Sequence, residues 1–192
     1  MANATRIMTG KVRLSYVHLF KPYAANAGQE EKYSCTILVP KHDVATKAKI
    51  DAAINAAIEK GITGKWAGVK PPRPALPIYD GDGTRPSDGA EFGPECKGHW
   101  VFTASAKVEY APGVIDAMKH PILNQSEIYS GIYARVSVTF YPYATGGKKG
   151  IGVGLNNVQK LADGEPLAAS AIRAEDEFDA VQIDPLTGEP IL

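Results

Sequence analysis

Residues 127–161 read EIYSGIYARVSVTFYPYATGGKKGIGVGLNNVQKL, and this stretch decides the fold. Over residues 132–140 the even positions are apolar and the odd positions are polar or aromatic, a period of two that is typical of a half-buried strand. After a Gly-rich turn at 144–150, residues 151–155 alternate apolar side chains with glycines. The stretch therefore predicts a β-hairpin with one face in the core.

The outer face of this hairpin is expected to carry aromatic and basic side chains. They are Tyr133, Arg135, Tyr141 and Tyr143 on the first strand and Lys148 and Lys149 in the turn. Sites that bind single-stranded nucleic acid need rings that stack on bases and cations that follow the phosphates. The outer face favours such binding, although outward tyrosines also form plain cross-strand packing pairs.

Alternation of apolar and polar residues predicts three further strands, at residues 11–20, 32–39 and 100–110. The first of them places Val12, Leu14 and Tyr16 on its inner face. Basic residues fall on the outer faces, namely Lys11 and Arg13 on the first strand and Lys107 on the last.

A single helix is expected at residues 44–60, because Asp43 suits the N-cap and isoleucines recur every fourth residue. Five strands, one helix and no βαβ alternation favour a mainly β fold, either a small barrel or an α+β domain. The smallest architecture that fits is an OB-type five-stranded barrel with the helix plugging one end.

Residues 61–99 form a long connection with eight glycines and six prolines, which excludes continuous helix or a central strand. Its aromatic residues include Trp66, Tyr79 and Phe92. They either pin the connection onto the barrel or contact a ligand, and Trp66 is retained as a candidate for base stacking.

Charge divides the chain in two, although the net charge is zero. Residues 1–172 hold 20 bases and 15 acids, whereas residues 173–192 hold one base and six acids. We expect the first part to form the folded domain and the second part to form a flexible acidic tail. An anionic tail of this kind can occupy a cationic groove and regulate access to it.

The sequence predicts a cytosolic protein without a membrane segment, because it lacks a run of roughly 18 apolar residues and a secretory leader. Cys35 and Cys96 are expected to be reduced thiols. No cofactor, metal or catalytic residue is predicted. A metal-dependent nuclease using Asp80, Asp82 and Glu91 remains an alternative, but the spacing of these acids suits a surface turn better.

Several segments resemble phage-encoded single-stranded-DNA-binding proteins with an OB fold. They are KVRLSYVHLFKPYA at 11–24, YSCTILVPK at 33–41 with TKAKIDAAINAAIEKG at 46–61, and EIYSGIYARVSVTFYPY at 127–143 followed by KGIGVGLNNVQKLADGEPL at 149–167. The resemblance implies an OB barrel, sequence-independent binding of single strands in phage DNA replication or recombination, and an acidic tail that contacts replication proteins. It also implies that the sheet bearing Tyr133, Arg135 and Tyr141 is the DNA face.

We therefore expect a non-enzymatic single-stranded-DNA-binding protein in the host cytoplasm, and self-association is compatible with this expectation. The residues expected to hold phosphates are Lys11, Arg13, Lys107, Arg135, Lys148 and Lys149, and those expected to stack on bases are Trp66, Tyr133, Tyr141 and Tyr143. The alternative is a structural β-barrel protein of the virion, for which the tyrosine face and the Pro/Gly-rich loop would be subunit contacts.

Overall fold

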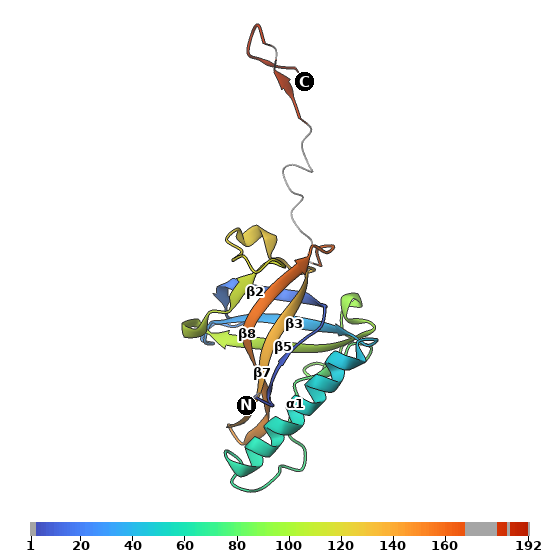
Figure 1. Cartoon of the computed structure of the whole chain (residues 1–192), viewed down its shortest axis with the longest axis vertical. Coiled ribbons are helices and arrows are strands. Elements are labelled where there is room, and N and C mark those ends of the chain that lie inside the picture. The colour runs from blue at the N-terminus through green and yellow to red at the C-terminus, as the bar shows by residue number, and fades with distance from the viewer. Residues whose placement is uncertain (1–2, 168–179, 184, 192) are drawn as a thin grey trace.

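The computed structural model describes residues 3–167, 180–183 and 185–191 (Figure 1). These residues are mainly β with one long helix, as the sequence predicts. The elements are β1 (Arg6–Met8), β2 (Val12–Tyr23), β3 (Lys32–Pro40), α1 (Val44–Thr63), β4 (Tyr79–Asp80), β5 (His99–Lys107), β6 (Gly113–Ile115), β7 (Tyr133–Thr145), β8 (Lys148–Ala162), β9 (Gln182–Ile183) and β10 (Pro190–Ile191).

Five of the strands close into a ring. β2 pairs with β3, β3 with β5, β5 with β8, β8 with β7, and β7 returns to β2. The β5–β8 pair is parallel and the other four are antiparallel. The short strands β1, β4 and β6 add to β7, β5 and β8 respectively. This ring confirms the predicted five-stranded OB barrel.

The inner face of β7 forms the centre of the core. Its even positions are Ile132, just before the strand, then Ala134, Val136, Val138 and Phe140, and each is at most 1% exposed. Side chains of the other barrel strands, such as Ile37 and Phe102, complete this core. The period-two prediction for residues 132–140 is therefore confirmed.

Helix α1 covers one end of the barrel and packs mainly on β7 (Figure 1). The Asp43 carboxylate caps its N-terminus, accepting hydrogen bonds from the Thr46 amide at 3.0 Å and hydroxyl at 2.6 Å. These bonds stabilise the ionised form and lower the pKa of Asp43. The helix runs past the predicted end to Thr63, because Gly61 stays helical and packs on the Trp66 ring.

The prediction that Tyr16 faces the core is wrong. Val12 and Leu14 are fully buried as expected, but the pairing of β2 with β3 shifts register between Ser15 and His18. Ser15 is therefore buried, whereas Tyr16 takes a φ of 46° and is 68% exposed. A bulge of this kind re-aims side chains, and here it moves an aromatic ring to the outer surface of the sheet.

The hairpin of β7 and β8 is longer than its sequence pattern indicates. Only Gly146 and Gly147 separate the strands, with φ values of 58° and 77°, where the prediction gave a turn over 144–150. Positive φ at both central residues is the geometry of a tight hairpin turn that matches the strand twist. β8 then continues to Ala162 and pairs with β7 along its length.

Five of the six acids of the predicted tail lie outside the described residues. Residues 173–179, 184 and 192 are among those not described. In the described part, β9 and β10 pair as a two-residue antiparallel ribbon. The flexibility of residues 173–192 stays a prediction. Within the described residues, no helix has the length and apolar character needed to cross a membrane.

Candidate nucleic-acid interface

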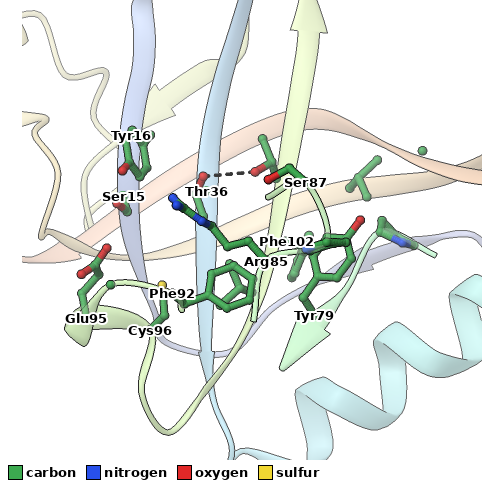
Figure 2. A pocket seen from close by; sticks show the side chains of 17 residues that line it. Ser15, Tyr16, Thr36, Tyr79, Arg85, Ser87, Phe92, Glu95, Cys96 and Phe102 are labelled. Atoms are coloured by element: carbon green, nitrogen blue, oxygen red, sulfur yellow. Dashed lines mark hydrogen bonds between the residues drawn. The ribbon is translucent and has the colours of Figure 1, made fainter. Parts of the chain in front are cut away.

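The outer faces of β3 and β5 form a polar surface, which we call the sheet groove. Three cross-strand pairs line it, namely Lys32–Lys107, Ser34–Ser105 and Thr36–Thr103. The Thr36 and Thr103 hydroxyls are hydrogen bonded at 3.1 Å (Figure 2). Two hollows of about 520 and 480 Å³ open on this surface and share Tyr16, Thr36 and Thr103 in their walls. The surface is therefore one continuous concave path.

Aromatic rings from β2 form one wall of the sheet groove. Tyr16 borders both hollows, and the rings of His18 and Tyr23 stack with centroids 4.3 Å apart and planes 9° apart. Tyr23 is 51% exposed, so its ring is open to a ligand. Sequence reasoning missed these residues because it assumed that the alternation continues unbroken past Ser15. The alternation breaks between Ser15 and His18, and this break is the signal that could have found them.

The opposite wall comes from the Pro/Gly-rich connection. Tyr79, Arg85 and Phe92 line the larger hollow, and the rings of Tyr79 and Phe92 lie 6.5 Å apart (Figure 2). Backbone hydrogen bonds from Ala75 to Lys149 and from Ile151 to Ala75 attach the connection to β8. The connection is thus ordered against the barrel and completes a binding surface.

A lysine holds the two acids that the nuclease alternative assigns to metal binding. Lys41 Nζ lies 2.6 Å from both Asp80 Oδ1 and Asp82 Oδ2. Its hydrogen bonds lower the pKa of both aspartates, and theirs raise the pKa of Lys41. Among the residues that the structure describes, no group of acids, histidines and cysteines is arranged to hold a metal ion. Asp80 and Asp82 instead anchor the connection.

Neither cysteine has the surroundings of a reactive thiol. Cys35 is fully buried in the barrel, and this burial raises its pKa to about 12. Cys96 is buried below the larger hollow, and burial raises its pKa to about 11. Both thiols are unpaired and remain protonated at neutral pH.

Like charges face each other at one end of the sheet groove. Lys32 on β3 pairs in register with Lys107 on β5. On its other side, Lys32 pairs with Tyr23 on β2. Two like charges directly opposite each other destabilise a sheet. The Glu30 carboxylate lies 3.7 Å from Lys32 Nζ and offsets part of that cost. An anionic ligand can offset the rest, so the pair favours a phosphate beside the Tyr23 ring.

Tyr141 is the predicted stacking residue that borders the sheet groove. It is 44% exposed and lies across Gly152, which lines the larger hollow. A Cβ at Gly152 would lie 2.5–2.8 Å from the Tyr141 ring, so only glycine permits this close approach. Of the ten predicted site residues, Lys107 and Tyr141 are those that the sheet brings to this surface.

Four other predicted residues gather at the far end of β7, and we call them the Tyr133 cluster. They are Lys11, Arg13, Tyr133 and Arg135. Lys11 Nζ lies 4.7 Å and the Arg13 guanidinium 5.7 Å from the Tyr133 ring centre. Arg13 also donates to the Glu165 carbonyl at 2.6 Å. Eight strand residues, about 26 Å, separate Tyr133 from Tyr141, so the cluster lies apart from the sheet groove.

The remaining cations lie at the tip of the β7–β8 hairpin. Lys148 and Lys149 are exposed there, and together with Arg73 they line a shallow hollow of about 480 Å³. Tyr143, on the same hairpin, is half-buried. Its side chain lies against Gly150, so only part of the ring is open to a ligand.

The structure corrects the assignment of Trp66 to base stacking. Its side chain is 1% exposed and belongs to the core cluster. The indole Nε1 donates a hydrogen bond to the Tyr143 carbonyl at 3.0 Å. Trp66 lies three residues after the end of α1 at Thr63, and its ring is buried between the helix and β7, so it pins the connection onto the barrel.

Comparisons with known proteins identify the family. The family model described as Enterobacter phage Enc34, ssDNA-binding protein matches residues 5–186. The chain belongs to this family. A solved structure of the single-stranded DNA-binding protein from bacteriophage Enc34 in complex with ssDNA is 31% identical, with a TM-score of 0.72 over 86% of this chain and 91% of that one. Another solved structure of the single-stranded DNA-binding protein from bacteriophage Enc34 is 30% identical, with a TM-score of 0.70 over 92% of each chain.

A more distant structure shares the fold alone. It is gp2.5, a single-stranded DNA binding protein encoded by bacteriophage T7, at 16% identity and a TM-score of 0.56 over 89% of this chain and 98% of that one. A comparison with curated proteins finds no match. The sheet groove lies on β3 and β5, which are the second and third strands of the barrel in chain order. OB folds in general bind oligonucleotides on this face.

Proposed function

We propose that this protein binds single-stranded DNA in the sheet groove, without requiring a particular sequence, during phage DNA replication or recombination. The observation that carries the proposal is the continuous concave surface on β3 and β5, with aromatic walls and a lysine pair. Membership of the Enc34 family supports it, since a relative 31% identical has been solved in complex with ssDNA. The family thereby favours DNA binding over the virion alternative.

The side chains divide by role along the groove. Tyr16, Tyr23 and Tyr141 stack on bases, since each ring is at least 44% exposed on the outer surface. Lys32 and Lys107 hold phosphates, and the lysines of the hairpin tip extend the cationic path. The Tyr133 cluster, whose residues the sequence alone predicts, then contacts a part of the DNA strand that lies beyond the groove.

The proposed activity is binding without catalysis, in the cytoplasm of the infected host cell. The family is described as ssDNA-binding. Lys41 forms ion pairs with Asp80 and Asp82, the acids that the nuclease alternative assigns to metal binding. Mg²⁺-dependent cleavage of labelled DNA by the purified protein would contradict this part of the proposal.

Replacing the groove tyrosines tests where the DNA lies. Tyr16→Ala combined with Tyr23→Ala is expected to weaken binding of a labelled poly-dT of about 30 nucleotides by roughly a hundredfold, because each lost base stack costs about 1–3 kcal/mol. The measurement is a fluorescence-anisotropy titration at two salt concentrations. Both side chains are exposed, so folding should be preserved.

Tyr133→Ala is the matched control, since it removes the tyrosine ring that the sequence alone places on the DNA face. We expect it to weaken binding less than fivefold, on the order of one exposed contact or less. If Tyr133→Ala has the larger effect, the DNA lies on the Tyr133 cluster and the sheet groove is not the main site.

We also propose that residues 173–192 regulate access to the sheet groove. They carry six acids and one base, against an excess of five bases in residues 1–172. An anionic segment competes with DNA for cationic sites and is available to replication proteins once DNA displaces it.

Deleting residues 173–192 is therefore expected to tighten binding of poly-dT by about tenfold at low salt, and the difference should shrink as salt screens the charges. The anisotropy titration is run on the full chain and the deletion variant side by side. A variant in which the six acids of this segment become Asn or Gln serves as the control of equal length. Equal affinities for all three proteins would rule out competition by the tail.

A further inference from the structure

The larger hollow of the sheet groove contains an acidic side chain that forms no ion pair with any described residue, whereas Glu30 in the smaller hollow lies 3.7 Å from Lys32 Nζ. Glu95 lines this hollow and is half-buried (Figure 2). Within the described residues, its carboxylate forms no ion pair and no hydrogen bond. A carboxylate repels phosphate groups at close range. The backbone of a bound strand therefore passes elsewhere, and the hollow is open to a base.

The walls of the hollow suit a flat, uncharged ring. Tyr79 and Phe92 stand on one side, with an angle of 34° between their planes, and Tyr16 stands on the other. The floor is formed by the hydrogen-bonded hydroxyls of Thr36 and Thr103. A volume of about 520 Å³ lies within the range of small-molecule sites. One nucleobase can therefore enter between aromatic faces.

We propose that this hollow receives one base of the bound strand and that Glu95 makes guanine the preferred base. A carboxylate only accepts hydrogen bonds. Guanine presents two adjacent donors, N1–H and the N2 amino group, which a carboxylate can accept together. Thymine presents a single N3–H between two carbonyl oxygens, which the carboxylate repels. This inference rests on the proposed function and specifies the ligand of the same site.

Arg85 supplies donors for the acceptors on the other edge of guanine. It lines the same hollow, and Asp88 holds its guanidinium through bonds of 3.2 Å from Nε and 2.8 Å from a terminal nitrogen. These bonds use two of the five donors of the guanidinium and leave others free to reach O6 and N7. Arginine is the side chain that most often reads these two atoms.

Oligonucleotides of about 30 nucleotides that differ at every third base test the preference. We expect the full chain to bind a d(TTG) repeat about tenfold more tightly than poly-dT, and to bind d(TTA) and d(TTC) repeats with intermediate affinity, because adenine and cytosine each offer the carboxylate one amino group. In Glu95→Gln the amide keeps the shape but replaces one acceptor by a donor. This variant should bind all four oligonucleotides within about twofold of one another.

Glu59→Gln is the control, because it removes one negative charge from the exposed face of α1, away from the hollow. It should retain the tenfold preference for the d(TTG) repeat. The inference is overturned if the full chain binds all four oligonucleotides equally, or if Glu95→Gln keeps the guanine preference. If the unchanged protein binds none of the four oligonucleotides, the proposed function on which this inference rests is refuted instead.

Discussion

Reversing the charge of both Lys32 and Lys107 to glutamate is expected to weaken binding of poly-dT by at least about a hundredfold, because two charge-assisted contacts to phosphates are lost at roughly 1.5 kcal/mol each. The two side chains are register partners at the end of the sheet groove beside Tyr23. The variant replaces one like-charged pair by another and removes the exposed Lys32–Glu30 ion pair, a contact that contributes about 1 kcal/mol or less, so the sheet itself should be little changed in stability.

The salt dependence of this variant separates local contacts from general charge. Each phosphate contact on a single strand contributes about 0.7 to the log–log salt slope, so the slope should become shallower by about 1.4. Lys49→Glu combined with Lys65→Glu is the matched control, since both lysines are exposed on or beside α1. A control that weakens binding as much as the groove variant would show that net charge, and not the lysine pair, controls affinity.

Trp66→Ala is expected to lower the free energy of unfolding by about 3–5 kcal/mol, as large aromatic deletions in a core do. The indole is 1% exposed and donates to the Tyr143 carbonyl, so the change leaves a cavity and an unpaired acceptor. Urea unfolding followed by circular dichroism measures the loss. Protein that remains folded should bind poly-dT as before, because the ring is not open to a ligand.

Two further variants serve as controls for this prediction. Tyr110→Ala removes an aromatic ring that is 74% exposed, and it should change the unfolding free energy by less than about 0.5 kcal/mol. Trp66→Phe preserves most of the packing if the alanine variant does not fold. A Trp66 variant of normal stability that fails to bind DNA would restore the sequence-based assignment of this residue to base stacking.

The sequence predicts local features of this fold well. Alternation over residues 132–140 gives the core face of β7, and Asp43 marks the start of α1. Both features depend on neighbours within a few residues, which a pattern in the chain records directly. The β-barrel with one helix follows from counting such elements, and the ring of β2, β3, β5, β8 and β7 confirms it.

The location of the candidate site could not be read from the same patterns. The groove depends on β3 and β5 lying side by side, and these strands are separated by α1 and the Pro/Gly-rich connection. The sequence singles out Lys107 but not Lys32, and only the pairing of the two strands brings these like charges together. A long-range pairing of this kind leaves no periodic trace in either segment.

By itself, the sequence determined which residues of the hairpin face the core, where the helix begins, and that the body and tail of the chain differ in charge. These are properties of single segments. The tertiary structure alone decided which aromatic rings are available: the bulge after Ser15 turns Tyr16 outward, and packing behind α1 buries Trp66. Exposure depends on what the rest of the chain places over a side chain, and that is settled only when distant strands pair around a common core.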